Sequence, residues 1–397
     1  MPVNGNVEKL DLGGGGGTTT GLTRHAGAEG RTRAHVIRLA LISSLQNAQS
    51  NAGSAHTLDQ GTHMTRLIAR NILLLAVLLC ASAARAEVNE IRLARQYGIA
   101  FLPFIVMEQH KLIEKHAKEQ ALGDVKVSWG QFAGSAGMND ALLSDNLSFG
   151  AGAVPSLILL WARTKGSPQE VRGVSATNSM PVYLNTRNPS INSLKDFTDK
   201  DKIALPSVKL STAAIVLQMA AAKTFGDANY AKLDSLTVSM SHPDAVAAIL
   251  SDASEVNSHF ASPPYQIIEL KNPRIRNVLS SYDVMGDASL TAVWTTKKFA
   301  DANPKTVAAV FAAVKDAVDT INRDKKAAAE LYLSVTKEKT PLADMMQLLN
   351  DPRTIFTNVP QASLRFAEFM HKIGTIKEAP ASWRDMFLPI AHKLPGS

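Results

Sequence analysis

Short apolar runs alternate with stretches of helical periodicity from Glu87 onward, and this alternation limits the fold more than any other feature of the chain. Strands are expected over residues 91–97, 125–129, 147–149, 182–185 and 202–205. Helices are expected over residues 102–113, 137–143 and 155–162, and from Thr212, His242 and Asn303 onward. Strands that alternate with helices are typical of α/β sheets with crossover connections. The sequence therefore predicts an α/β fold.

Proline marks the start of two of these helices. Pro243 follows His242 and Pro304 follows Asn303, and proline is favoured in a first turn because its missing N–H would have no partner there. The second of these helices carries the longest apolar stripe, which predicts packing against a core: Val307, Val310, Phe311, Val314, Val318 and Ile321. The remaining residues are expected to be mostly helical.

Residues 64–86 match the pattern of a secretory signal peptide. Arg66 and Arg70 are followed by an apolar run over residues 72–79, and Ala84-Arg85-Ala86 supplies a small-x-small cleavage pattern. The apolar run is shorter than a membrane span requires. We expect translation to start at Met64, cleavage after Ala86, and export to the periplasm. A buried helix or a membrane anchor is the alternative interpretation.

Residues 1–63 have a different composition from the rest of the chain. A run of five glycines at 13–17 precedes three threonines, and Ala, Ser, Asn and Gln are frequent thereafter. Such a segment buries too little apolar surface to offset the entropy lost on ordering. We expect these residues to be a disordered or an untranslated extension.

Loss of residues 1–86 would lower the formal charge from +7 to +3, because this segment holds eight basic and four acidic residues. The remaining charge is too small to indicate a nucleic-acid partner, and no basic cluster with interleaved aromatics is present. The single cysteine, Cys80, lies in the predicted signal peptide. The mature chain would therefore contain no disulfide, thiolate nucleophile or cysteine-ligated metal. We expect no metal and no cofactor.

Three segments rich in small residues combine glycine or hydroxyl groups with an expected helix start. They are residues 131–137, residues 150–153, and residues 207–212. The free N–H groups of a first helical turn favour an anion, and small side chains allow a ligand to approach the backbone. The candidate ligand contacts are Gln131, Ser135, Gly150, Ala151, Gly152, Lys209, Ser211 and Thr212. A tight turn, a simple N-cap or a solvated lysine is the alternative at these positions.

Aromatic residues and one histidine complete the set of candidate contacts. Tyr97, Phe101 and Trp129 would supply apolar walls, although aromatic side chains more often pack in cores. His259 and Phe260 are expected in a loop before Pro263, where they would line a cleft. A surface histidine with satisfied hydrogen bonds is the equally strong alternative for His259.

Known catalytic patterns are absent from the sequence. Ala133 stands where a nucleophile elbow around Ser135 needs its first glycine. His110, Glu114 and His116 share one polar helix, but their spacing differs from His-Glu-x-x-His. The catalytic patterns in the sequence are therefore poor, and they do not favour an enzyme.

Four segments between residues 91 and 321 form a series with a characteristic order and spacing. They are Phe101-Leu102-Pro103, Phe149-Gly150 ahead of Pro155, residues 191–197 ahead of Lys202-Ile203-Ala204, and Phe260-Ala261-Ser262-Pro263-Pro264. With this series the chain resembles the solute-binding proteins of nitrate/sulfonate/taurine-type ABC transporters. The family often has Asp where Ser148 stands, so its ligand contacts do not carry over directly.

The resemblance implies a two-lobed type II periplasmic binding protein, in which each lobe is a mixed sheet flanked by helices and C-terminal helices follow. Residues 87–182 and 290–397 would form the first lobe, and residues 183–289 the second. Hinges would lie near residues 180–184 and 286–293. The implied protein is a monomer that captures a small ligand, first of all an anion, by hinge closure and delivers it to a membrane permease and its ATPase.

Two other functions remain open from the sequence. One is an enzyme on the same fold that converts a small heterocycle or carboxylate. The other is a sensor module that presents its loaded form to a membrane receptor. The side chains that face the cleft decide the ligand, and the resemblance does not fix them.

Overall fold

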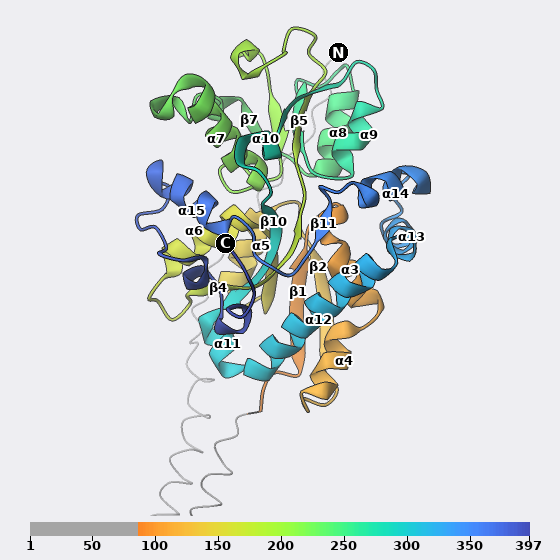
Figure 1. Ribbon diagram of the computed structural model, residues 1–397, viewed down its shortest axis with the longest axis vertical. Coiled ribbons are helices and arrows are strands. Elements are labelled where there is room, and N and C mark those ends of the chain that lie inside the picture. Colours follow the sequence, from red (N-terminus) through yellow and green to blue (C-terminus); the bar gives the residue numbers. More distant parts are fainter. Residues whose placement is uncertain (1–85) are drawn as a thin grey trace, which may run out of the picture. The chain divides into compact units, whose positions relative to one another are not determined.

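The computed structural model describes residues 86–397, which form a two-lobed α/β structure (Figure 1). The predictions for residues 1–63, for the signal peptide and for Cys80 therefore lie outside the described residues. Each lobe is built on one mixed sheet. We call the part on the six-stranded sheet lobe 1 and the part on the five-stranded sheet lobe 2.

The lobe 1 sheet has the strand order β11-β4-β10-β3-β1-β2. Strands β2 and β3 pair with β1 in parallel, whereas β10 and β11 are antiparallel to their neighbours. Because β1, β2 and β3 are parallel, their carboxyl ends meet at one edge of the sheet. The strands are β1 Glu90–Arg95, β2 Lys126–Gln131, β3 Phe149–Ala153, β4 Val171–Ser179, β10 Ser289–Thr296 and β11 Ile355–Phe356.

The lobe 2 sheet has the order β7-β6-β8-β5-β9. Strand β6 pairs in parallel with β7 and β8, and β5 is antiparallel to β8 and β9. The chain passes between the two sheets through residues 180–182 and returns through residues 286–288. The strands are β5 Tyr183–Thr186, β6 Ile203–Leu205, β7 Thr237–Ser239, β8 Ser258–Ala261 and β9 Arg276–Ser280.

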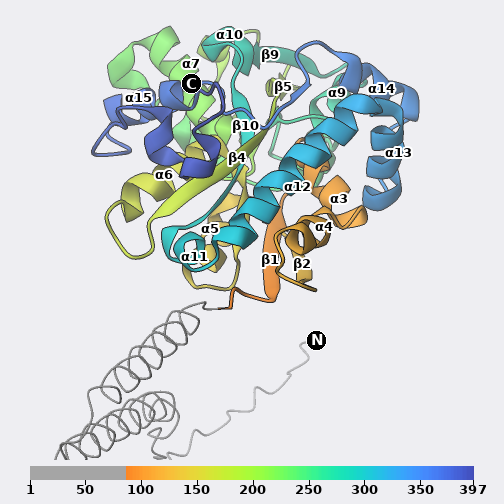
Figure 2. The same cartoon turned by 60° about the horizontal axis from the view of Figure 1, so that its bottom comes forward.

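Helices cover both faces of the lobe 1 sheet (Figure 2). Helix α12 packs along α3 and α4 on one face, and α5 and α6 pack on the other. Pro304 opens α12, whose valine stripe is buried as predicted from the sequence. The helices of this lobe are α3 Leu102–Gln109, α4 Leu112–Glu119, α5 Ser135–Leu143, α6 Val154–Thr164, α11 Lys297–Ala302, α12 Pro304–Arg323 and α13 Lys325–Thr336.

Lobe 2 carries four helices of its own: α7 Thr212–Phe225, α8 His242–Leu250, α9 Tyr265–Leu270 and α10 Ser281–Met285. The C-terminal helices α14 Leu342–Asn350 and α15 Ser363–Lys372 reach lobe 2 from two sides. Asp344 of α14 pairs with Lys271, and Lys372 of α15 lies 2.7 Å from Asp227. Six short 3₁₀ helices complete the described part: Ile99–Phe101, Leu194–Asp196, Asp227–Asn229, Asp234–Leu236, Trp383–Met386 and Pro389–Ala391.

The predicted α/β fold with two mixed sheets is confirmed, while several predicted elements are wrong in detail. Residues 102–113 form two helices, because Lys111 adopts the left-handed conformation between them. The small residues 150–153 belong to strand β3, and the expected helix start follows directly, because α6 begins at Val154 with Ala153 as its N-cap. His259 and Phe260 lie in strand β8 and not in a loop, because their neighbours on β5 and β6 pair with them on both sides.

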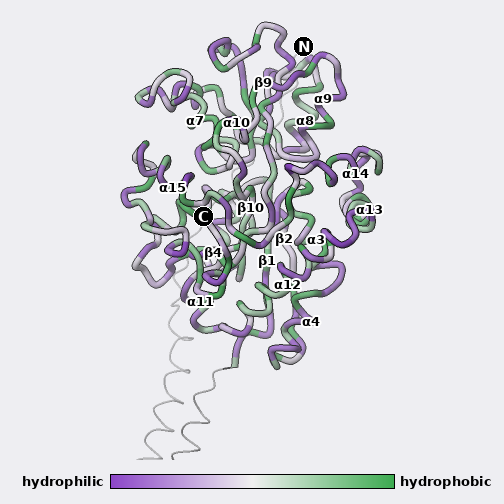
Figure 3. The backbone as a smooth tube through the Cα atoms, viewed as in Figure 1, coloured by the Kyte–Doolittle hydropathy of each residue, from purple (hydrophilic) through white to green (hydrophobic). Residues whose placement is uncertain are grey.

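Apolar side chains form the interior of both lobes, and the hydrophilic residues lie mainly on the outer turns and helix faces (Figure 3). The main cluster runs from the lobe 1 sheet through the crossing segments into lobe 2, where Val182 and Leu184 belong to it. Within residues 86–397, no helix combines the length and the apolarity that a membrane span needs.

Candidate functional site

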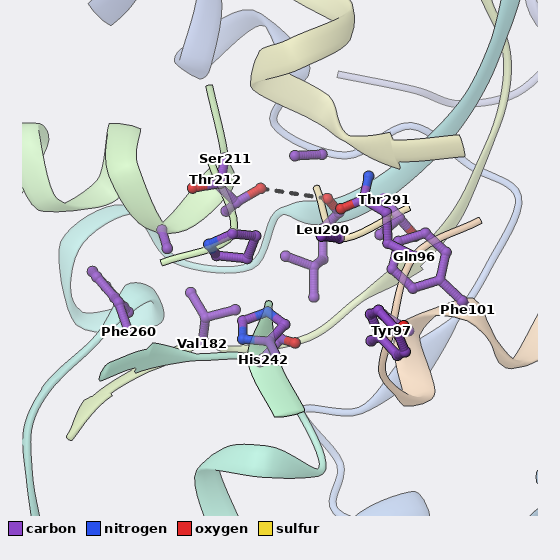
Figure 4. Close-up of a pocket in the computed structure, with 16 residues that line it drawn as sticks. Gln96, Tyr97, Phe101, Val182, Ser211, Thr212, His242, Phe260, Leu290 and Thr291 are labelled. Carbon is purple, nitrogen blue, oxygen red and sulfur yellow. Dashed lines mark hydrogen bonds between the residues drawn. The ribbon is translucent and has the colours of Figure 1, made fainter. Parts of the chain in front are cut away.

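A cavity of about 40 Å³ lies between the two lobes, beside Val182 of the first crossing segment and the start of β10 (Figure 4). It is lined by elements of both sheets and by the first turn of α7. All the lining side chains are apolar, or polar without a permanent charge: Gln96, Tyr97, Ala100, Phe101, Ala133, Ala153, Val182, Pro206, Ser211, Thr212, Ala213, His242, Phe260, Ser262, Leu290 and Thr291. The lining therefore suits a ligand that has an apolar part and a few hydrogen-bonding atoms.

The lobe 1 wall contains a fixed amide. Gln96 follows the end of β1, and its Nε2 donates to Ser135 Oγ at 3.1 Å and to the carbonyl oxygen of Ala151 at 3.4 Å. Gly152 makes this position possible, because a Cβ there would lie only 2.4 Å from the amide nitrogen. Tyr97 and Phe101 extend the same wall with aromatic surface.

The first turn of α7 forms part of the lobe 2 wall. Ser211 is the N-cap, and its Oγ accepts a hydrogen bond from Ala214 N at 3.2 Å. Thr212 Oγ1 donates to the carbonyl oxygen of Leu290, in strand β10 of lobe 1, at 3.4 Å. The N–H groups of Thr212 and Ala213 have no helical partner four residues earlier, so they and the helix dipole favour an anionic ligand atom.

The rest of the lobe 2 wall contains His242, the first residue of α8, which begins a chain of buried polar groups. Its Nδ1 lies 2.8 Å from His259 Nε2 on β8. His259 Nδ1 in turn contacts Glu269 Oε1 on α9, and Glu269 Oε2 accepts from Asn185 Nδ2 at 2.9 Å. His259, Glu269 and Asn185 are fully buried, so this chain runs from the lobe 2 interior to the cavity.

Burial lowers the pKa of His242 well below its ordinary value of 6.5, and a positive charge on His259 would lower it further. The helix position acts in the same direction, since a cation at the first residue of α8 faces the positive end of the helix dipole. His242 is therefore neutral at pH 7. Its ring stacks on Tyr265, with the centroids 5.4 Å apart.

The two lobes touch at the edges of the cavity. Ile99 N donates to the carbonyl oxygen of Pro263 at 3.1 Å, and Ser135 N donates to Ser207 Oγ at 3.1 Å. Gly134 permits the second contact, because a Cβ there would lie 2.3 Å from the carbonyl oxygen of Pro206. Gly98 adopts φ 110°, which favours glycine, and lies against Pro263. The lobes are therefore closed on each other at this point.

A second cavity of about 400 Å³ adjoins the first and shares Gln96 and Tyr97 with it. It reaches outward past Tyr332 and Glu338 near the end of α13. Burial raises the pKa of Tyr265, Tyr332 and Glu338 in this region. Arg95 also lines it, and its guanidinium pairs with Glu108 at 2.9 Å. The charged side chains near the site therefore belong to the outer cavity.

The structure brings eight of the predicted contacts together at the small cavity. Five of them line it: Tyr97, Phe101, Ser211, Thr212 and Phe260. Ser135, Ala151 and Gly152 lie behind the lobe 1 wall, where they position Gln96.

Three further predicted contacts belong to lobe 1 but lie away from the small cavity. Trp129 lies in β2 and packs edge-on against Phe104, with ring centroids 6.5 Å apart. Gln131 lines the outer cavity. Gly150 lies in β3 against the Trp294 indole. A ligand contact for these residues stays a prediction.

The last three predicted contacts belong to lobe 2. Lys209 is exposed in the left-handed conformation, and it acts electrostatically on Asp234. Pro263 contributes its carbonyl oxygen to the contact between the lobes. His259 lies one residue behind the wall and touches the cavity only through His242.

The sequence did not indicate Gln96 or His242 as site residues. Neither stands in a motif, and each acquires its role from partners far along the chain: Ser135 for Gln96, and His259 for His242. A helix start at His242 was the only signal for either residue. Across residues 86–397 no group of three or more His, Cys, Asp and Glu side chains is arranged to hold a metal ion.

Comparisons with known proteins identify the fold. No protein-family model matches the chain, and no curated protein matches its sequence. Among solved structures, the alkanesulfonate-binding protein SsuA from Xanthomonas axonopodis pv. citri bound to MOPS matches with a TM-score of 0.60 and 16% identity, covering 76% of this chain and 99% of its own.

Two further solved structures match at comparable levels. The periplasmic aliphatic sulphonate binding protein SsuA from Escherichia coli has a TM-score of 0.55 and 17% identity, over 76% of this chain and 92% of its own. The periplasmic nitrate-binding protein NrtA from Synechocystis PCC 6803 has a TM-score of 0.55 and 17% identity, over 78% of this chain and 86% of its own. The chain therefore has the fold of the periplasmic binding proteins, in agreement with the resemblance read from its sequence.

Proposed function

We propose that this protein is a solute-binding component of an ABC importer, which captures a small organic anion between its lobes. The cavity between the two lobes carries the proposal, because residues of both lobes line it and no permanently charged side chain does. The sulfonate- and nitrate-binding proteins of the same fold support it. A membrane permease with its ATPase would be the partner, and the periplasm the location.

The chemistry of the walls supports an organic anion over a cation. The free N–H groups at the start of α7 suit the anionic group, and no carboxylate of the described residues lines the small cavity to attract a cation. Phe101, Phe260 and Leu290 offer apolar surface to a hydrocarbon part. A sulfonate or carboxylate with a short apolar substituent would place its anionic group at the start of α7 and its substituent against the apolar side chains.

Closure about the crossing segments is the proposed mechanism. Residues 180–182 and 286–288 join the sheets, and a rotation there would open the contacts at Gly134 and Ile99. A ligand that touches both lobes binds the closed form better and so shifts the population toward it. The protein would act as a monomer.

Isothermal titration of the protein against ethanesulfonate, taurine, acetate and nitrate tests the proposal. We expect heat with at least one of these anions, and mass spectrometry should recover that anion chemically unchanged. Conversion of the anion would indicate an enzyme. Binding of a neutral or cationic solute alone would contradict the anion preference.

A further inference from the structure

The chain of polar groups from Glu269 to His242 has only a few possible arrangements of protons. One ring nitrogen of His259 faces Glu269 and the other faces His242. If His259 donates to His242, then His242 Nδ1 must accept; if His259 accepts from His242, then His242 Nδ1 must donate. Asn185 donates from its amide to Glu269, which occupies the second carboxyl oxygen as an acceptor. The proton state of the Glu269–His259 pair therefore sets which nitrogen of His242 carries hydrogen.

Two of these arrangements are electrically neutral overall. In one, a Glu269 carboxylate pairs with a His259 imidazolium; in the other, a protonated Glu269 donates to a neutral His259. In both, His259 Nε2 carries hydrogen and donates it to His242 Nδ1. His242, being neutral, must then carry its own hydrogen on Nε2.

The third arrangement leaves a net negative charge in the interior. Here a Glu269 carboxylate accepts from a neutral His259, whose Nε2 accepts from His242 Nδ1, so that His242 Nε2 carries a lone pair. An unbalanced buried charge is costly, and neither Lys nor Arg contacts Glu269 among the described residues. The neutral arrangements are therefore favoured.

The groups that surround His242 come from both lobes. Tyr265 and Glu269 approach from α9, His259 from β8, and Gln96 and Tyr97 from lobe 1. Asp244 lies in α8 itself, where its carboxylate accepts a hydrogen bond from the N-cap residue Ser241, and Glu338 lies beyond Tyr265. Among these, the Glu269 carboxyl is the acid linked to His242 through hydrogen bonds.

We propose that the Glu269–His259 pair holds His242 as a neutral imidazole that offers its Nε2–H to an acceptor atom of the bound ligand. No hydrogen bond within residues 86–397 uses this nitrogen, and the ring lines the cavity opposite lobe 1. His242 is thus the specificity-determining donor of the lobe 2 wall, and His259 and Glu269 are positioning residues. The identity of the occupant rests on the proposed function, whereas the proton arrangement does not.

The tautomer can be read directly by nitrogen NMR of the full chain labelled with ¹⁵N-histidine. The signals of His242 are assigned by their loss in His242→Gln, and His110→Gln, at an exposed position, serves as the control that removes a different pair of signals. We expect His242 at neutral pH to carry hydrogen on Nε2 only. A proton on Nδ1, or on both nitrogens, would overturn the proposal.

Addition of ethanesulfonate separates this inference from the proposed function. If ethanesulfonate binds and moves the Nε2–H signal, both stand, and His242→Leu should weaken binding about tenfold or more while His242→Gln, which keeps an N–H, weakens it less. If ethanesulfonate binds and the signal does not move, the donor role fails and the function stands. If the tautomer is as expected and no anion binds, the function fails and the proton arrangement stands.

Discussion

The two walls of the cavity are built from different chemistry. In lobe 1, Gln96 is held by a hydroxyl and a carbonyl, and none of these groups titrates near neutral pH. In lobe 2, His242 is held by His259 and, through it, by Glu269. One wall is thus fixed by neutral dipoles, and the other by an ionisable chain. Any dependence of ligand binding on pH should therefore arise in lobe 2.

The same contrast applies to stability. Loss of a neutral hydrogen-bonding partner leaves single unsatisfied groups, which typically costs about 1–3 kcal/mol. Loss of one member of a buried, ionisable pair typically costs about 3–5 kcal/mol, because the other member is left without compensation. The lobe 2 wall should consequently be the more sensitive of the two to substitution.

Substitution of Glu269 should have the largest effect. Glu269→Ala leaves His259 Nδ1 and Asn185 Nδ2 without their shared hydrogen-bonding partner in a fully buried site. We expect the free energy of unfolding to fall by about 3–5 kcal/mol, measured by urea denaturation. Gln96→Ala in the lobe 1 wall should cost about 1–3 kcal/mol.

Glu368→Ala, at an exposed position of α15, is the matched carboxylate control and should change the free energy of unfolding by about 0.5 kcal/mol or less. Equal losses for Glu269→Ala and Gln96→Ala would remove the distinction between the two walls.

The contact between the walls can be broken with a single methyl group. Gly134→Ala places a Cβ 2.3 Å from the carbonyl oxygen of Pro206, so the lobes should be held apart. We expect a larger radius of gyration by X-ray scattering and about tenfold weaker binding of ethanesulfonate, which corresponds to about 1.4 kcal/mol.

Gly137→Ala, in α5, is the control for this substitution. A Cβ there lies 3.5 Å from the Phe132 ring, which is ordinary contact, so neither quantity should change. Alanine in the helix should even stabilise the fold by about 0.5–1 kcal/mol. A radius of gyration that is the same for both variants would show that the Gly134 contact does not control closure.

The sequence predicted those parts of the fold in which apolar residues recur with helix or strand periodicity. The valine stripe of α12 and the strand–helix alternation after Glu87 gave the α/β architecture. Strand β4 was not predicted, because its buried residues include Ser175, Thr177 and Asn178, which give no apolar pattern. The side-chain Nδ2 of Asn178 donates to groups that are distant in sequence, among them the carbonyl oxygen of Ala100 at 2.7 Å, and no local sequence pattern indicates such partners.

The candidate site shows the same limit. Ser211 and Thr212 were predicted because a helix start can be recognised from local sequence. The role of His242 depends on His259, 17 residues away and on another element, and on Glu269 beyond it. Local patterns therefore indicated the neutral parts of the site and one member of the ionisable chain, His259, but they did not indicate His242 or Glu269.

The pH dependence of the free energy of unfolding distinguishes the two walls, because His242 of the lobe 2 wall titrates and Gln96 of the lobe 1 wall does not. Burial lowers the pKa of His242 in the folded state, so as pH falls below about 6.5 the unfolded chain takes up a proton that the folded chain does not. The stability due to this residue is therefore present above pH 6.5 and is lost as pH falls toward the folded pKa, by up to about 1.4 kcal/mol per pH unit.

Urea denaturation at a series of pH values measures this loss. The wild-type protein and Gln96→Ala should lose stability with similar slopes below pH 6.5, whereas His242→Gln should have a shallower slope. A slope that is unchanged in His242→Gln would show that the lobe 2 wall does not contribute to the pH dependence.

The smallest effect on ligand binding is expected for substitution of Lys209. This substitution tests whether a charge near the cavity, but outside its walls, contributes to binding. The residue is exposed and does not line the cavity, and its charge is screened by solvent. Lys209→Ala should therefore weaken binding of ethanesulfonate by about twofold or less, and it should reduce the association rate more than it raises the dissociation rate. Thr212→Ala, which removes a lining hydroxyl, should raise the dissociation rate instead. If Lys209→Ala weakens binding more than Thr212→Ala does, the lysine reaches the ligand and the lobe 2 wall is not neutral.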